Sequence, residues 1–146
     1  MTVERMASMD EVQEEIIREM SDLEDRLAQY EYLVAQGRAL EVPDAAIIRN
    51  DAYAIPGCQA SVWIRAELDE GRLRLSADSD ALINKGIIAL LLRVLDGRRP
   101  AEVAHADLHF LDRTGLRTHL SPARSNGLGT LVNQIRAVAR SMAQSA

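Results

Sequence analysis

The fold is decided by residues 59–95, which read QASVWIRAELDEGRLRLSADSDALINKGIIALLLRVL. Every second residue from Val62 to Leu68 is apolar, and the same alternation resumes from Leu73 to Ala77 after Glu70-Gly71. A period of two residues is typical of strands that cover a core with one face. We therefore predict an antiparallel hairpin that turns at Glu70-Gly71.

A strongly apolar helix is predicted directly after the hairpin, from about Ala81 to Leu95. Residues 87–92 are apolar nearly all round, which is typical of a helix buried in the centre of a protein. The preceding Asp78-Ser79-Asp80 offers side-chain oxygens that could cap this helix. The alternative is that one of these carboxylates lies at the surface near the cysteine described below.

Helical patterns flank this central stretch on both sides. Apolar residues recur at three- and four-residue spacing from Met9 to Tyr32, with a capping-box pattern at Ser21–Glu24 where the helix could restart, and Gly37 is a natural stop. Short helices are expected near 101–105 and 108–114, and a last helix after Ser121-Pro122. The predicted fold is α+β, a small antiparallel sheet packed against several α-helices. We expect a single domain over residues 1–146, with residues 1–20 as an N-terminal helical extension.

Composition narrows the class of protein. The 146 residues are 47% hydrophobic and 27% charged, as in an ordinary globular domain. No apolar run is long enough to span a membrane, and Met1 to Asp10 lacks the apolar core of a secretory signal. We expect a cytoplasmic protein that does not bind membranes.

The charges are distributed unevenly along the chain. From Glu4 to Glu31 there are ten acidic and three basic residues, whereas from Arg98 onward there are seven arginines and three acids. The acidic stretch is either a solvated helix face or a docking surface for a protein partner. The arginines are spread out and not interleaved with aromatic residues, so we expect no nucleic-acid binding.

Cys58 is the only cysteine of the chain and follows Pro56-Gly57 at the entry to the first strand. It has no partner for an internal disulfide, and with three scattered histidines we expect no metal site. The residues alone leave two interpretations open: an inert buried thiol, or a reactive thiol presented by a turn. A reactive thiol would fit a sulfur carrier, a thiol peroxidase without a resolving cysteine, or a redox-sensitive binding domain.

Arg124 is predicted in the first turn of the last helix, where its charge opposes the helix dipole. This placement invites a functional explanation, although a carboxylate neighbour would also account for it. A cation near Cys58 would stabilise the thiolate, which is the nucleophile in sulfur exchange.

Three segments carry a resemblance to a known family. Residues 57–64, GCQASVWI, resemble the G-C-Q-x-x-V-W segment of the SufE family of sulfur-acceptor proteins, which includes the related CsdE. Residues 78–86, DSDALINKG, are similar to its D-S-D-A-x-I-x-K-G segment, and residues 119–128, HLSPARSNGL, to its H-L-[ST]-P-x-R-x-x-G-[LM] segment. The three segments occur in the order that the family has.

The resemblance implies a SufE/IscU-like fold and a role as an accessory sulfur carrier. Such a protein binds a cysteine desulfurase of the SufS or CsdA kind, takes persulfide sulfur onto its cysteine and stimulates desulfurase turnover. Sulfur then passes to iron–sulfur cluster assembly, through a scaffold such as SufBCD. The chain itself would need no cofactor, because pyridoxal phosphate belongs to the desulfurase. It would not be an independent enzyme, at most a subunit of a persulfide sulfurtransferase.

Carried onto this sequence, the resemblance implies that Cys58 is the catalytic sulfur acceptor. The residues implied around the acceptor loop or the partner surface are Gly57, Gln59, Asp80, His119 and Arg124. One alternative is a regulatory binding module that activates a desulfurase without carrying sulfur. A cluster scaffold is disfavoured, because cluster ligation normally requires several cysteines.

Overall fold

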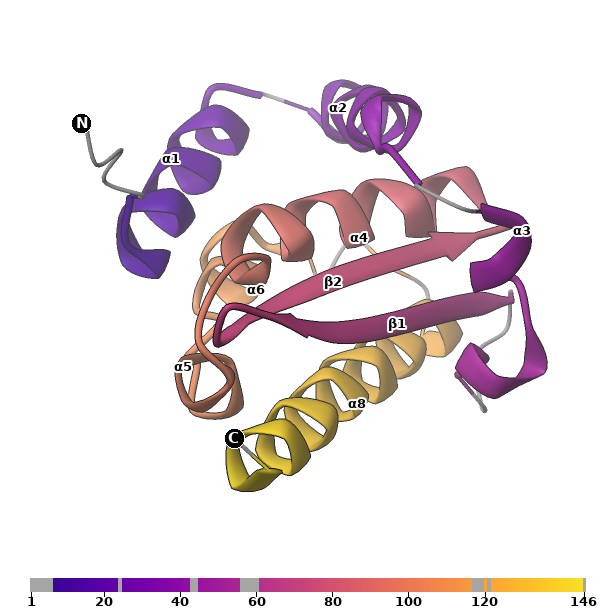
Figure 1. Ribbon diagram of the computed structural model, residues 1–146. Coiled ribbons are helices and arrows are strands. Elements are labelled where there is room, and N and C mark those ends of the chain that lie inside the picture. Colours follow the sequence, from indigo (N-terminus) through magenta and orange to yellow (C-terminus); the bar gives the residue numbers. More distant parts are fainter. Residues whose placement is uncertain are drawn as a thin grey trace.

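The computed structural model describes residues 7–23, 25–42, 45–55, 61–116, 120 and 122–145, without the side chains of 122–124 and 145. The elements are α1 (Met9–Ser21), α2 (Arg26–Ala39), α3 (Ala45–Ile48), the 3₁₀ turn η1 (Asp51–Tyr53), β1 (Val62–Asp69), β2 (Arg72–Ser79), α4 (Leu82–Leu95), α5 (Pro100–Ala104), α6 (Phe110–Arg113) and α8 (Pro122–Ser145). In Figure 1, α4 runs alongside β2 and α8 alongside β1, and α1 and α2 lie on the side of α4 away from the hairpin. The predicted α+β fold is confirmed.

The hairpin has the predicted strands and turn. β1 and β2 form a two-stranded antiparallel sheet whose register pairs Val62 with Ser79 at one end and Asp69 with Arg72 at the other. Glu70 and Gly71 both have positive φ, 52° and 78°, as the two central residues of a type I′ turn require. The buried apolar side chains of the core-facing side are Val62, Ile64, Leu73, Leu75 and Ala77.

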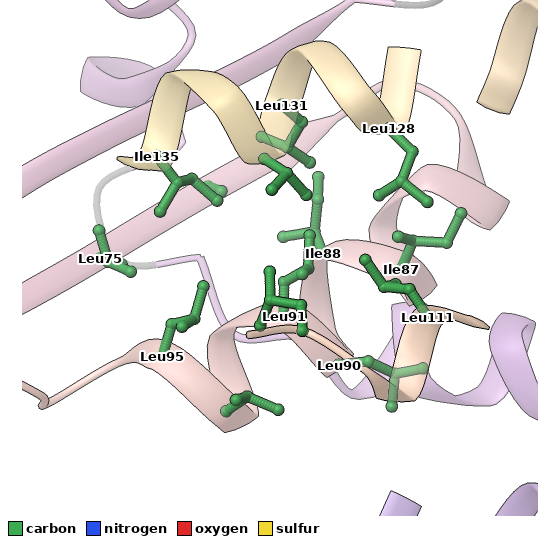
Figure 2. Close-up of a cluster of buried hydrophobic side chains, with 14 of the residues drawn as sticks. Leu75, Ile87, Ile88, Leu90, Leu91, Leu95, Leu111, Leu128, Leu131 and Ile135 are labelled. Atoms are coloured by element: carbon green, nitrogen blue, oxygen red, sulfur yellow. The ribbon is translucent and has the colours of Figure 1, made fainter. Parts of the chain in front are cut away.

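The central helix α4 is buried, as the sequence predicts. Its buried residues are Gly86, Ile87, Ile88, Leu90, Leu91, Val94 and Leu95. Figure 2 shows Leu128, Leu131 and Ile135 of α8 directed toward the α4 side chains, with Leu75 of β2 beside them. The core is thus assembled on α4 from both the hairpin and the C-terminal helix.

The predicted cap of α4 is wrong. Ala81 is the N-cap residue and makes no side-chain capping bond. Asp78 and Ser79 are buried within the end of β2, at 2% and 1% exposure. Asp78 is held there by cations, as described below, and the Ser79 hydroxyl donates to the Ser61 carbonyl (2.7 Å). The Ser79 hydroxyl also accepts from the Ala81 N–H (3.2 Å), just before the helix, but neither Asp78 nor Ser79 is the N-cap residue of α4.

Helices α2 and α4 approach each other closely at two glycines. A Cβ at Gly86 would lie 2.1 Å from the carbonyl oxygen of Leu33, and one at Gly37 would lie 2.7 Å from that of Leu82. Gly37 was expected to end its helix, but α2 continues to Ala39. The role of Gly37 is instead to let two backbones come into contact.

The N-terminal helix α1 belongs to the same core and is tied to it by polar contacts. Ile16 and Met20 are buried, and the buried Gln13 amide donates to the Asp107 carbonyl (3.0 Å) and accepts from the Phe110 N–H (3.1 Å). The expected break after α1 is confirmed at Ser21, but the cap that restarts the helix is Asp25, which accepts from the Ala28 N–H. Ser21 therefore ends a helix and does not begin one.

An ion-pair network joins α1, α2 and α4. The Arg93 guanidinium lies 2.6 Å from Glu19 and 3.2 Å from Glu15, and the Tyr32 hydroxyl donates to Glu19 (2.7 Å). The hydrogen bond from Arg93 lowers the pKa of Glu19 despite partial burial, and burial together with the Glu19 contact raises the pKa of Tyr32. Glu19 is therefore ionised at neutral pH and Tyr32 is neutral.

The remaining helices follow the predicted pattern. α5 and α6 lie in the two segments predicted as short helices, and α8, the predicted last helix, buries Leu128, Leu131 and Ile135. Among the described residues, no helix is long and apolar enough to cross a membrane.

Substituting Gly86 by alanine should destabilise the protein by about 3 kcal/mol, because the added methyl group overlaps the backbone of α2. Urea unfolding followed by far-UV circular dichroism measures the change. Gly129→Ala in α8 is the matched control: nothing lies within 4 Å of its added Cβ, so the better helix propensity should raise stability by up to roughly 1 kcal/mol. Equal effects of the two changes would contradict the close helix contact.

Substituting Glu19 by glutamine should lower the free energy of unfolding by about 1 kcal/mol at pH 7, a small effect because the side chain is 38% exposed. The folded-state pKa of Glu19 is depressed, so its contribution is complete above the unfolded pKa of about 4.3 and is lost as pH falls through the folded value. The difference between wild type and variant should therefore shrink below about pH 4.

The control for this change is Asp69→Asn, which removes an ion pair with Arg74 whose side chains are 51% and 67% exposed. It should change stability by less than about 0.5 kcal/mol at any pH. Both variants are measured by urea unfolding between about pH 2 and pH 7. A wild-type advantage that grows toward low pH would rule out the assigned role of Glu19.

Candidate functional site

Most of the site residues named from the sequence lie outside the described residues. This holds for Gly57, Cys58, Gln59 and His119. Arg124 lies in the first turn of α8, as predicted, but its side chain is not among those described. Asp80 is exposed directly after β2. That these residues lie close together stays a prediction. The site described below consists of the residues on either side of segment 56–60 and their neighbours.

The two residues that flank segment 56–60 are held at the same end of the hairpin. On one side, the Ile55 N–H donates to the Val62 carbonyl (2.9 Å), next to a bridge between Ala54 and Trp63. On the other side, the Ser61 carbonyl accepts from the Ser79 hydroxyl (2.7 Å) and from the Asp80 N–H (3.3 Å). The chain therefore leaves and re-enters the described structure beside the junction of β2 and α4.

A buried carboxylate lies at this junction. The Asp78 side chain is 3% exposed, and its oxygens lie 2.8 Å from Arg49 Nε and 3.5 Å from Lys85 Nζ. It also accepts from the Ser79 N–H (2.8 Å). We call Arg49, Trp63, Asp78, Ser79 and Lys85 the Asp78 cluster.

Arg49 makes further contacts within the cluster. Its Nη2 donates to the Ser79 carbonyl (3.4 Å), and its guanidinium carbon lies 4.9 Å from the centre of the Trp63 ring. A guanidinium on an aromatic face is attracted by the ring's quadrupole and stacks on it. One side chain thus joins the segment after α3 to both strands of the hairpin.

The cluster carries a fixed negative charge between two cations. Burial alone would raise the pKa of Asp78, but the hydrogen bonds from Arg49 and from the Ser79 N–H outweigh it, and the pKa is lowered. Asp78 is therefore ionised at neutral pH. Leaving such a buried charge unpaired would be costly, so the cation contacts are needed where the carboxylate lies.

Sequence reasoning missed this arrangement. Neither interpretation of Asp78-Ser79-Asp80, helix capping or a surface charge near the thiol, describes Asp78. One signal was present: Trp63 falls on the polar side of an alternating strand. The register pairs Trp63 with Asp78, so a large aromatic ring and a carboxylate share the outer face of the sheet. Arg49 gave no comparable signal, because nothing local places it opposite residues 63 and 78.

Among the described residues we find neither a metal site nor a reactive side chain. No group of three or more His, Cys, Asp or Glu among them could hold a metal ion. The Asp78 cluster contains no activated nucleophile, since the Ser79 hydroxyl donates to the Ser61 carbonyl and not to a general base. Its contacts join Arg49, the two strand ends and the start of α4 beside the residues that flank 56–60.

Comparison with known proteins gives the family. The model of the SufE family, described as an Fe-S metabolism associated domain, matches residues 14–139. An uncharacterized SufE-like protein of Synechocystis is 35% identical over 123 residues, which cover 83% of this chain and 77% of the relative. One from Rhizobium meliloti is 29% identical over 140 residues, 92% of this chain and 96% of the relative.

Two further matches bear on length and fold. The chloroplastic/mitochondrial SufE-like protein 1 of Arabidopsis thaliana is 35% identical over 116 residues, 79% of this chain but 31% of that longer protein. The solution structure of a hypothetical protein from Thermus thermophilus matches with a TM-score of 0.72 at 20% identity, covering 89% of this chain and 94% of that one, and shows the shared fold. Because the SufE family model matches residues 14–139 and the relatives are themselves SufE-like proteins, the chain belongs to the SufE family.

Proposed function

We propose that this protein is a sulfur acceptor that binds a cysteine desulfurase and takes persulfide sulfur onto Cys58. It thereby stimulates desulfurase turnover and relays sulfur to iron–sulfur cluster assembly. The observation that carries the proposal is the family match over residues 14–139, which includes the chain's only cysteine within a Gly-Cys-Gln segment. The anchoring of Ile55 and Ser61 on either side of that segment supports it.

The proposed reaction is a thiol–persulfide exchange. The Cys58 thiol gives its proton to solvent, and the thiolate attacks the outer sulfur of the desulfurase persulfide. A bond forms between Cys58 Sγ and that sulfur while the bond to the desulfurase cysteine breaks. The desulfurase cysteine leaves as a thiolate, and Cys58 becomes a persulfide. No external oxidant or reductant is required, because the sulfur is transferred between two thiols.

The other site residues have supporting roles in the proposal. Gly57, Gln59, His119 and Arg124 would surround the acceptor or the partner surface, by their positions in the family segments. Asp80 has a described position: it is exposed, and its N–H is bonded to Ser61. An exposed carboxylate beside the re-entry of segment 56–60 is available to a docking partner.

The proposal extends to partners and compartment. The desulfurase would be SufS- or CsdA-like and would carry the pyridoxal phosphate, and the downstream acceptor would be a scaffold such as SufBCD. The protein would act in the cytoplasm as a single domain over residues 1–146, with residues 1–20 as its helical extension, and without nucleic acid or membrane.

Incubation of the protein with a cysteine desulfurase, cysteine and pyridoxal phosphate should add the mass of one sulfur atom, because Cys58 is the only thiol that can accept it. Intact-protein mass spectrometry without reductant measures the product. Treatment with a reducing thiol should then remove the added mass.

Cys58→Ser is the control for this experiment and also separates the alternative function. The variant should gain no sulfur and should not stimulate alanine production by the desulfurase. A variant that still stimulates turnover would favour a regulatory module that carries no sulfur. Equal addition of sulfur to the wild type and the variant, or none to the wild type, would contradict the carrier function.

A further inference from the structure

We propose that Arg49 is a positioning residue for sulfur transfer: it holds the chain that leads to Cys58 against the end of the hairpin. The inference rests on the proposed function, because it concerns the rate at which Cys58 accepts sulfur. It is carried by the contacts of Arg49 with Asp78, Ser79 and Trp63; Lys85 also contacts Asp78, but only Arg49 makes all three contacts among the described residues.

The segment before residues 56–60 is attached to the hairpin at several places, including the bridge between Ala54 and Trp63 and the Arg65 guanidinium 5.9 Å from the centre of the Tyr53 ring. Ile55 is attached by its backbone bond to Val62, and Ile48 is fully buried at the end of α3. Between these points, residues 49–54 are mostly exposed. Arg49 is the residue whose side chain crosses back from this segment to both strands. Its contacts therefore add a side-chain attachment, reaching both strands, to the contacts that Tyr53, Ala54 and Ile55 make with β1.

The geometry requires an arginine. Nε binds the Asp78 carboxylate and Nη2 the Ser79 carbonyl, while the flat guanidinium lies over the Trp63 ring. A lysine ammonium is a point charge that cannot make these contacts from one plane. The other oxygen of Asp78 already faces Lys85. Asp78 thus has two positively charged neighbours, Arg49 and Lys85. Only Arg49 adds planar, directional contacts with the Ser79 carbonyl and the Trp63 ring.

Removal of Arg49 should leave a folded protein. The Arg49 side chain is 43% exposed, and Asp78 would keep its contacts with Lys85 and the Ser79 N–H. The buried apolar core does not include Arg49. We therefore expect the Arg49 variants to be less stable, because Asp78 loses one of its two cations, but still folded, and to hold the chain before residues 56–60 less firmly.

A defect in positioning has a distinct kinetic signature. Attack on a persulfide requires the thiolate to meet the outer sulfur in line, so a loosened acceptor lowers the rate within the complex. Substrate affinity is unaffected if the residue does not itself touch the partner. A residue that docks the desulfurase would instead raise the KM for this protein.

The test compares Arg49→Gln and Arg49→Lys with Arg74→Gln, which removes an exposed ion pair near the opposite end of the hairpin. Single-turnover sulfur loading is measured over a range of desulfurase concentrations. We expect the maximal rate to fall roughly tenfold in both Arg49 variants, with the half-saturating concentration unchanged and no rescue by lysine. Arg74→Gln should load like the wild type.

Tryptophan fluorescence provides a readout independent of sulfur transfer. Trp63 is the only tryptophan of the chain, so its emission reports directly on the guanidinium stacked over it. Both Arg49 variants should shift the emission, and Arg74→Gln should not. Should Arg49→Gln unfold, Trp63→Leu tests the same contact from the other side and should also lower the maximal rate.

Several outcomes would overturn the inference. A raised half-saturating concentration with an unchanged maximal rate would make Arg49 a docking residue. Full activity of Arg49→Lys would show that charge suffices. If the wild type accepts sulfur and the Arg49 variants accept it equally fast, the role of Arg49 is wrong but the proposed function stands. Wild-type protein that accepts no sulfur would contradict the proposed function itself.

Discussion

The structure depends on the burial of α4, a helix that is apolar on nearly every side. Apart from a few exposed residues such as Leu82 and Arg93, the helix must be kept from water, so most of its surface needs a covering element. The hairpin and α8 cover one side, and α1 and α2 cover the other (Figure 1). The glycines at 37 and 86 let α2 approach α4 until the backbones are in contact, which places both helices within one core.

The position of α4 also determines where the candidate site lies. The helix begins immediately after β2, so the end of the hairpin, the start of α4 and the chain on either side of residues 56–60 meet in one place. Asp78 is buried at that junction because Lys85 from α4 and Arg49 from the segment after α3 neutralise it. The same ion pairs that allow the carboxylate to be buried thus tie three separate parts of the chain together.

Much of the fold could be predicted because its signals are local. Alternation over residues 62–77 identifies both strands, and the apolar run at 87–92 identifies the central helix. The predictions that failed concern residues with two possible roles. Gly37 can end a helix or admit a neighbouring backbone, and Asp78 can cap a helix or accept ion pairs, and only neighbours distant in sequence decide between these roles.

The sequence by itself determined the fold class, the family resemblance and the position of the one cysteine on which the proposed function rests, because each depends on residue types in a local order. Tertiary structure decided that Arg49, 29 residues before Asp78, joins it at the hairpin end and lies over Trp63. The physical reason is that a buried charge must find its partners in space, and the partners of Asp78 come from α4 and from the segment after α3.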